Sequence, residues 1–413
     1  MKADLDRIMA ERGLDALMVT GGALNNPPMY YLTNGAHVTE STILIKKRGE
    51  APVLFASAME RDNAAKSGLT VRTHHEMGYM DIVKAVEGDR LQATLQYRAK
   101  LLKDLGITGK VGVYGVVEVS SAFHLYQTLS DMLPDVEIVG EYPDNVFTAA
   151  WLTKDHEEIA RIQKVGEKTL QVVEKTRLFL ASHSHDGERL LKADGRPLTI
   201  GDVHARIRTW LHDAGLEAPD GFIFAIGYDS ALPHSPGEPD RELKLGQTIV
   251  YDIFPREAGG GYYYDFTRTW CLGYVPDDVQ AIYDDVYAAF QVGLSKLKAG
   301  LTGDESQKAV VEFFKSRNHP TADGNQGYVH SLGHGVGLNI HEPPSLSTHG
   351  GQNYTLTPGM TLTIEPGLYY PDKGIGVRLE DFVWLNPATG EFEVVGGNYP
   401  KTLLIELADP DDE

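Results

Sequence analysis

The residues best suited to chemistry in this chain are four carboxylates and one histidine in its second half. Each lies in a short apolar or glycine-rich stretch: Asp252, Asp265, His334, Glu365 and Glu380. Acidic side chains are rarely buried unless they are paired or bind a metal ion. Two divalent cations would neutralise four carboxylates. The pattern therefore predicts a dinuclear metal site, and with it a hydrolase.

The two aspartates lie in separate strand-like segments. Asp252 is in QTIVYDIF (247–254), Asp265 is in YYYDFTRTWCLG (262–273), and a turn at 257–261 separates them. An antiparallel hairpin here would bring both carboxylates to one face. A single aspartate near a strand end is more often a turn or cap residue, so the prediction depends on the remaining ligands.

A cluster of histidines occurs in the segment HSLGHGVGLNIHEPP (330–344). Imidazoles bind divalent ions and transfer protons near neutral pH. One of them could be a core histidine with satisfied hydrogen bonds. Three such residues so close together, His330, His334 and His341, are harder to explain by packing alone.

Glu365 in TIEPGLYY and Glu380 in VRLEDFVW lie in segments that otherwise read as apolar strands. An unpaired carboxylate there would destabilise the fold. Arg378 precedes Glu380 by two positions, and residues two apart on a strand share a face. Both are therefore predicted to line one interior polar site, where Arg378 either pairs with Glu380 or Asp381 or contacts a substrate.

Composition restricts the class of protein. The formal net charge of −20, from 38 basic and 58 acidic residues, argues against nucleic acid or an anionic membrane as partner. Cys271 is the only cysteine, which excludes an intrachain disulfide and a thiolate zinc site. No apolar run approaches the ~20 residues that span a bilayer, and the start lacks the apolar core of a signal peptide. We expect a cytoplasmic enzyme.

The elements that must position these residues fall into two parts. Up to about residue 140, helix-like and strand-like segments alternate, which is typical of an α/β layer structure. In this part STILIK (41–46) and PVLF (52–55) are expected to pair as strands, and 79–105 is compatible with one long helix.

A long amphipathic helix is predicted from Asp155 onward. The predicted domains are therefore 1–152 and 153–413, a division that suits the chain length. The second domain is richer in strands, with helices at 201–214 and 277–299.

The ordered set Asp, Asp, His, Glu, Glu resembles the pita-bread metallopeptidases, which include methionine aminopeptidase, aminopeptidase P and prolidase. The match spans about 150–413. Three further residues resemble the proline-specific branch: His234 in ALPHSPG, His341 before Glu342-Pro343, and Arg378 before Glu380. The resemblance implies an α+β protein. Its C-terminal pita-bread domain would follow a smaller α/β creatinase-like N-terminal domain, which is matched more weakly.

The resemblance also implies the chemistry. Two divalent ions per subunit, Mn²⁺, Co²⁺ or Zn²⁺, would be held in a homodimer that hydrolyses Xaa-Pro bonds of dipeptides or short peptides. Asp252 would hold one ion, His334 and Glu365 would favour the other, and Asp265 and Glu380 would bridge them. Glu365 would also take a proton from the attacking water. The resemblance further implies His234 and His341 at the scissile bond and Arg378 on a substrate carboxylate. His330, from the histidine cluster, is a further candidate catalytic residue.

Several activities stay open. A dipeptidase (prolidase) is favoured over an aminopeptidase P that takes longer peptides, on the basis of the modest chain length and an altered loop. That loop follows Asp252, where the family usually has a small glycine-containing turn and this chain has Ile253 to Glu257. Two further classes are a creatinase-like enzyme that works without metal and an inactive binding module. The complete set of five ligands argues against both.

Overall fold

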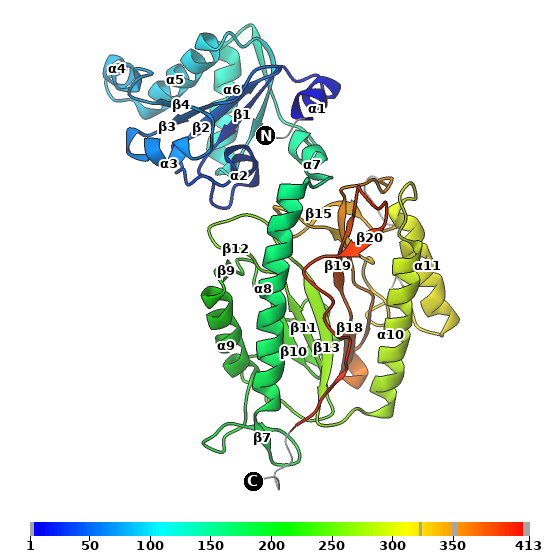
Figure 1. The fold of residues 1–413 in the computed structure, drawn as a ribbon. Coiled ribbons are helices and arrows are strands. Elements are labelled where there is room, and N and C mark those ends of the chain that lie inside the picture. The colour runs from blue at the N-terminus through cyan, green and yellow to red at the C-terminus, as the bar shows by residue number, and fades with distance from the viewer. Residues whose placement is uncertain (1–3, 322–323, 349–352, 408–413) are drawn as a thin grey trace. The chain divides into compact units, whose positions relative to one another are not determined.

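The computed structural model describes residues 4–321, 324–348 and 353–407. The chain forms two compact units, coloured from blue to green and from green to red in Figure 1. Unit 1 comprises Met1–Trp151 together with Gly259–Gly261, and unit 2 comprises Leu152–Ala258 and Tyr262–Glu413. All of the candidate site residues belong to unit 2.

Unit 1 contains a six-stranded mixed sheet in the order β4-β3-β2-β1-β5-β6. Strand β1 pairs antiparallel with β2 and parallel with β5, and β2 pairs antiparallel with β3, as the sequence predicts for 41–46 and 52–55. The strands are β1 (Ala16–Thr20), β2 (Ile43–Lys47), β3 (Val53–Ala56), β4 (Thr70–Thr73), β5 (Gly109–Tyr114) and β6 (Val136–Val139). The helices are α1 (Leu5–Glu11), α2 (Pro27–Thr33), α3 (Arg61–Ala65), α4 (Tyr79–Ala85), α5 (Arg90–Asp104), α6 (Val119–Met132) and α7 (Val146–Trp151).

The stretch 79–105, expected as one long helix, is two helices. Helix α4 ends at Ala85, and α5 begins at Arg90. Between them Glu87 and Gly88 have φ values of 51° and 84°, a left-handed conformation that a continuous helix cannot contain. Asp89 then starts α5, because its side chain accepts a hydrogen bond from the backbone N–H of Gln92 at 3.0 Å.

Unit 2 begins with the predicted long helix, α8 (His156–Ala181). Asp155 and Glu158 form a capping box at its start, with side chains accepting hydrogen bonds from each other's backbone N–H groups. The face that carries Ile162, Val165 and Val172 is buried. The other helices are α9 (Ile200–Asp213), α10 (Asp277–Lys296) and α11 (Gly303–Ser316).

The central sheet of unit 2 has the order β10-β11-β13-β21. Strand β11 (Thr248–Ile253) pairs antiparallel with β10 (Ile223–Ile226) and with β13 (Phe266–Leu272), and β13 runs parallel to β21 (Leu404–Ile405). The antiparallel pairing of β11 and β13 confirms the predicted hairpin. Asp252 lies opposite Thr267, and Asp265 directly precedes β13.

The strands predicted to carry the two glutamates are each interrupted at the glutamate. The first splits into β16 (Thr361–Ile364) and β17 (Gly367–Tyr370), the second into β18 (Ile375–Arg378) and β19 (Asp381–Leu385). Strand β16 pairs with β19, whereas β17 pairs with β18 in a separate sheet. Pro366 has no N–H to continue a ladder, so Glu365 and Glu380 lie where the chain passes from one sheet to the other.

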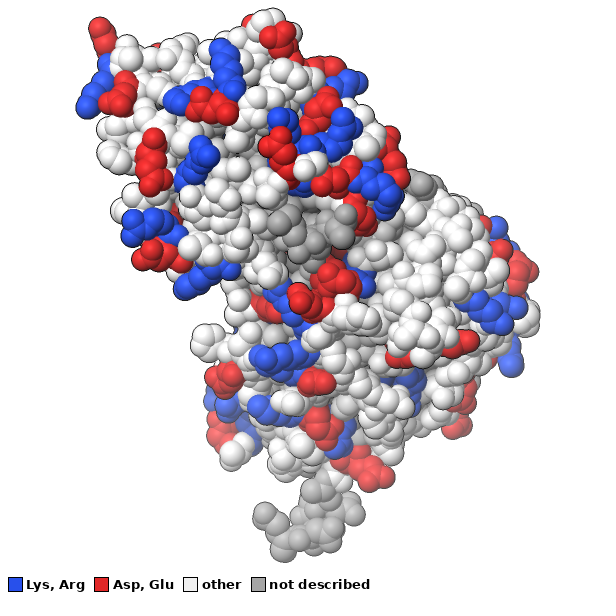
Figure 2. All heavy atoms as spheres, turned by 45° about the horizontal axis from the view of Figure 1, so that its top comes forward, with Lys and Arg blue, Asp and Glu red and all other residues white. Residues whose placement is uncertain are grey.

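Helices α10 and α11 supply much of the apolar packing near these strands. Side chains such as Phe290 and Phe314 belong to the same buried cluster as Leu362, Val377 and Leu379. On the face drawn in Figure 2, basic and acidic side chains are interspersed. Among the described residues, no helix is long and apolar enough to cross a membrane.

Candidate metal centre

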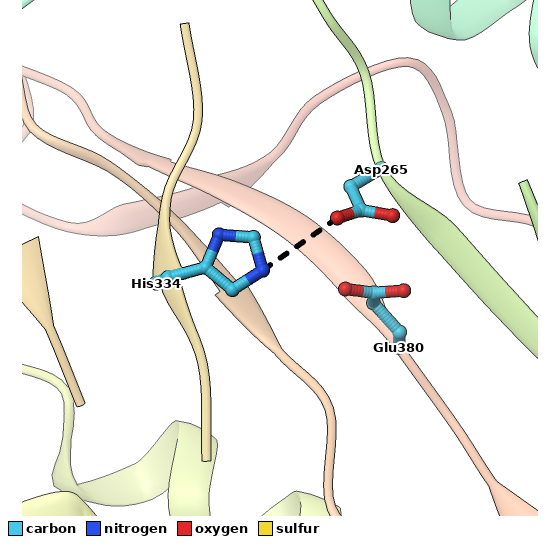
Figure 3. Close-up of side chains that lie close together, drawn as sticks. All are labelled: Asp265, His334 and Glu380. Carbon is cyan, nitrogen blue, oxygen red and sulfur yellow. Dashed lines mark ion pairs between the residues drawn. The ribbon is translucent and has the colours of Figure 1, made fainter. Parts of the chain in front are cut away.

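Three candidate ligands converge in the interior of unit 2. Asp265, His334 and Glu380 each offer a ligand atom, and these atoms all lie within 4.8 Å of one another. In Figure 3 the two carboxylates face the imidazole from different segments of chain. The Nε2 atom of His334 is 3.7 Å from Oδ2 of Asp265. The side chains are shielded, because those of His334 and Asp265 are only 12% and 7% exposed.

Glu365 belongs to the same cluster. Its Oε1 atom is 3.3 Å from Nε2 of His334, and it accepts a hydrogen bond from the hydroxyl of Thr363 at 3.2 Å. The same hydroxyl accepts from the backbone N–H of His334 at 3.0 Å. Thr363 therefore sets the relative positions of two candidate ligands that are distant in the sequence.

Burial and, after it, the charges of neighbouring carboxylates disfavour ionisation of the clustered acids. Burial, and then the charges of Asp252 and Glu365, hold the pKa of Asp265 well above its usual range. Burial and the charge of Asp265 do the same to the pKa of Glu380. Burial also raises the pKa of Glu365 to about 7. Bound cations would remove this penalty, so the donor set fits divalent metal.

His334 presents the correct nitrogen to this cluster. Its Nδ1 atom is 3.0 Å from the carbonyl oxygen of Gly335, to which it donates a hydrogen bond. That bond fixes the tautomer and leaves the lone pair of Nε2 directed at Asp265 and Glu365, the arrangement found in metal-binding histidines. Burial lowers the pKa of His334, which favours the neutral form that coordinates metal.

Asp252 reaches the cluster from β11 and is held by Arg378. Nη2 of Arg378 donates to Oδ2 of Asp252 at 2.5 Å, whereas Oδ1 is buried and has no hydrogen-bond partner among the described residues. A buried carboxylate oxygen without a partner is costly. A metal ion would supply the missing interaction.

Arg378 is engaged on several sides. Besides Asp252, it donates to the hydroxyl of Tyr369 at 2.6 Å and to the carbonyl of Pro233 at 3.2 Å. The Tyr369 hydroxyl lies 3.0 Å from Nε2 of His330, whose Nδ1 atom lies 2.8 Å from the Ser331 carbonyl. Burial and the nearby guanidinium lower the pKa of His330 to about 3, so this histidine is neutral.

Two more of the predicted histidines are exposed near the centre. The ring of His341 lies 4.2 Å from that of His334, centroid to centroid, at an interplanar angle of 49°. His234 interacts electrostatically with both His330 and His341. Both His234 and His341 are exposed to solvent, a position open to a substrate.

Sequence reasoning missed Arg268, a fully buried residue of β13. Its guanidinium donates to the carbonyl oxygens of Thr267 and Glu380 at 2.9 and 2.7 Å, and to Oδ1 of Asp381 at 2.8 Å. It also donates to the backbone of Tyr399 and Pro400. Arg268 thus fixes the chain on both sides of Glu380. An arginine inside the apolar segment FTRTWCL was the available signal.

A second missed feature is the ion pair between Lys154 and Glu342. The Nζ and Oε2 atoms are 2.8 Å apart, and both side chains are 2% exposed. The other oxygen of Glu342 accepts from the backbone N–H of Asn339 at 2.9 Å. These contacts fix the turn that carries His341. The sequence marks Glu342 only as the neighbour of that histidine.

A protein-family model, metallopeptidase family M24, matches residues 160–387, more than half of the chain. The chain belongs to metallopeptidase family M24. This confirms the resemblance to the pita-bread metallopeptidases and makes the protein an enzyme of that family. All of the proposed metal ligands lie within the matched M24 region.

Relatives and solved structures agree over almost the full length of this M24 chain. It is 27% identical over 382 residues to the Xaa-Pro dipeptidase of Pyrococcus horikoshii, an alignment that covers 91% of each chain. Its fold is similar to that of an X-Pro aminopeptidase from Thermotoga maritima, with TM-score 0.74, 23% identity, and 96% and 99% of the two chains covered. Its fold is also similar to that of a prolidase from Pyrococcus furiosus, with TM-score 0.71 and 24% identity. That comparison covers 96% of this chain and 100% of the prolidase chain. The predicted α+β fold with a preceding N-terminal region is confirmed.

Proposed function

We propose that this protein hydrolyses the peptide bond before proline, in Xaa-Pro dipeptides above all. The observation that carries the proposal is the convergence of Asp265, His334 and Glu380 inside an M24 region, with Glu365 and Asp252 beside them. The relative from Pyrococcus horikoshii, named as an Xaa-Pro dipeptidase and similar over 91% of the chain, supports this substrate class.

The metal centre that we propose holds two divalent ions, Mn²⁺, Co²⁺ or Zn²⁺. Oxygen and imidazole ligands suit these metals. Asp252 would hold one ion, His334 and Glu365 the other, with Asp265 and Glu380 shared between them. When bound, such a pair of cations lowers the pKa of water and stabilises negative charge that develops on the carbonyl oxygen.

Side chains of the protein are proposed to transfer the proton and to contact the substrate. A pKa of about 7 before metal binding means that the environment of Glu365 favours the protonated carboxyl, so Glu365 is the proposed acceptor of a proton from water. His234 and His341, both exposed beside the cluster, are suited to contact the scissile bond. Both ring nitrogens of His330 are engaged, Nδ1 with the Ser331 carbonyl and Nε2 with the Tyr369 hydroxyl, so this neutral histidine brings no charge to the substrate.

Arg378 takes a different role in this proposal from the one that the sequence suggested. Three of its contacts, to Asp252, Tyr369 and Pro233, are internal. A guanidinium that is 4% exposed and bonded in this way is poorly placed to hold a substrate carboxylate. We assign Arg378 as a positioning residue that orients Asp252.

The direct test is to assay Xaa-Pro dipeptides beside Xaa-Pro-Xaa tripeptides with added Mn²⁺. Hydrolysis of either class, with free proline or a prolyl peptide as product, supports the proposal. Cleavage of peptides without proline at equal rates would contradict it. The creatinase-like domain at 1–152, the catalytic domain at 153–413, the homodimer and the cytoplasmic location also remain proposals.

A further inference from the structure

The loop that carries His234 is closed at its two ends by an ion pair. Nε and Nη2 of Arg241 donate to Oδ2 and Oδ1 of Asp229 at 3.0 and 2.8 Å, the bidentate geometry that makes an arginine–carboxylate pair strong and directional. The backbone N–H of Glu238 donates to the same carboxylate at 3.2 Å. His234 lies between the paired residues in the sequence, so the pair encloses it in the loop 229–241.

Burial of one partner distinguishes this ion pair from a surface pair. The side chain of Asp229 is 5% exposed, whereas that of Arg241 is 42% exposed. Exposed ion pairs contribute little because water screens them. A buried carboxylate, in contrast, needs its cationic partner to offset the hydration that it has lost. Loss of the Arg241 guanidinium would therefore leave an unpaired buried charge at the base of the loop.

The first half of the loop rests on strand β18. A Cβ atom on Gly376 of β18 would lie 1.8 Å from the carbonyl oxygen of Ser230, so the two backbones are in direct contact there. Nη1 of Arg378, at the end of the same strand, donates to the carbonyl oxygen of Pro233 at 3.2 Å. The residue before His234 is thereby held by the arginine that orients a proposed metal ligand.

The second half of the loop rests on a different element, the start of helix α9. The backbone N–H groups of Ile200 and Gly201 donate to the carbonyl oxygens of Arg241 and Pro239 at 2.9 and 2.8 Å. One half of the loop is thus attached to β18 and the other to α9, with His234 between the two attachments. The ion pair links the two halves directly.

His234 is the residue of this loop that the proposed function uses. Its side chain is exposed, and it acts electrostatically on both His330 and His341 beside the metal centre. Contact with a scissile bond depends strongly on position, since a misplacement of ~1 Å can cost ~100-fold in rate. A pair that fixes the base of the loop can therefore affect the reaction without touching substrate or metal.

We propose that the Asp229–Arg241 ion pair positions His234 for the reaction by holding the two halves of its loop together. The proposal rests on the proposed Xaa-Pro hydrolysis and adds two positioning residues to it. Both residues act through His234, so their loss should lower turnover and leave metal binding intact.

The test is the double variant Asp229→Asn with Arg241→Gln, which removes both charges and so avoids the destabilisation that an unpaired buried charge would cause. We expect kcat for Ala-Pro to fall by roughly 10–100-fold, the scale of a misplacement of up to ~1 Å. Arg241→Lys, which keeps the charge and loses the fork, should give a smaller loss. Metal content should equal that of the wild type, and loss of metal in the double variant would overturn the proposal.

The same double change made in His234→Ala shows whether the pair acts through that histidine. It should then cause no further loss of kcat, because the effects of coupled residues are not additive. A general disturbance of the fold would lower kcat by the same factor in both backgrounds and would contradict the proposal. The matched control is Asp194→Asn with Arg196→Gln, which removes an exposed Asp–Arg pair of the same unit and should leave kcat unchanged.

Hydrogen exchange of backbone amides tests the closure of the loop without any substrate. The amide of Ser235 donates within the loop at 3.0 Å and that of Glu238 donates to Asp229. Both should exchange faster in the Asp229→Asn, Arg241→Gln variant, whereas amides of β11 and β13 should keep their rates. Unchanged exchange in the loop would overturn the proposal. If no Xaa-Pro peptide is hydrolysed but the loop exchanges faster in the variant, the proposed activity is wrong and the closure of the loop by this ion pair stands.

Discussion

Arg378 and Asp252 form a hydrogen-bonded ion pair at 2.5 Å that leaves only one oxygen of the aspartate available to a metal. The pair joins the end of β18 to β11, two strands that come from distant parts of the sequence. It therefore fixes which carboxylate oxygen of Asp252 faces the metal centre. Through the contacts of Arg378 with Tyr369, and of Tyr369 with His330, the position of Asp252 also depends on those two residues.

Replacing Arg378 by Lys tests this positioning role, because lysine keeps the charge but cannot form the planar fork. We expect kcat/KM to fall by similar factors, about 10–100-fold, for Xaa-Pro dipeptides and Xaa-Pro amides, the range typical of residues that orient a metal ligand. Metal content should also fall. A rise in KM confined to the dipeptides would instead show that Arg378 holds the substrate carboxylate.

Removing the metal should abolish hydrolysis. Dialysis against a chelator leaves the four clustered carboxylates with Arg378, the partner of Asp252, as their cationic neighbour, too little charge to balance them. Mn²⁺, Co²⁺ or Zn²⁺ should restore activity on re-addition. Metal analysis of the restored enzyme, together with the activity titration, gives the number of ions per chain. Full activity in protein shown to be metal-free would refute the mechanism.

Variants of the proposed metal ligands and variants of the neighbouring histidines should differ in the amount of metal that they retain. Asp265→Ala and Glu380→Ala should lose both metal and activity, because each carboxylate is proposed to serve two ions. His341→Ala should retain metal and lose roughly 10²–10⁴ in kcat, the usual contribution of a proton-transferring group. Loss of metal in His341→Ala would place that imidazole among the ligands.

The metal-free protein should become less stable as pH rises. Burial raises the pKa of Glu365 from 4.5 to about 7. Between those values the unfolded chain releases a proton that the folded chain retains, so the free energy of unfolding falls with increasing pH. Denaturant titrations of the chelated protein from pH 4.5 to 7.5 should show this decline. The same series with metal bound is the control and should not show it, whereas a flat series without metal would contradict the proposed clustering.

Lys154→Met should destabilise unit 2 by about 3–5 kcal/mol, because it leaves the buried carboxylate of Glu342 without its cation. Thermal or denaturant unfolding measures the loss. The double variant Lys154→Met with Glu342→Gln removes the unpaired charge and should recover part of the stability. If the single and double variants are equally stable, the ion pair is not what holds this turn.

The sequence was informative about the site where a charged residue occurs within an otherwise apolar segment. Charged residues in apolar strands led to the prediction of Asp252, Asp265, Glu365 and Glu380 as metal ligands, and the family match confirms the class of enzyme. The sequence could not reveal that the chain leaves one sheet for another at each glutamate, since apolar residues continue on both sides. It also could not reveal that Thr363 contacts both His334 and Glu365, because the role of a hydroxyl depends on neighbours that only the fold brings together.

The separation of the ligands along the chain has a consequence for folding. Asp252 and Glu380 lie 128 residues apart (380 − 252 = 128). The other three proposed ligands, Asp265, His334 and Glu365, come from separate segments between them. Closing such long loops precedes any coordination, and contacts of this kind form slowly. A metal ion therefore has no complete site to bind until the native sheets have assembled. Its binding should slow unfolding of the finished protein rather than speed folding, so the ion stabilises kinetically a structure that has formed without it.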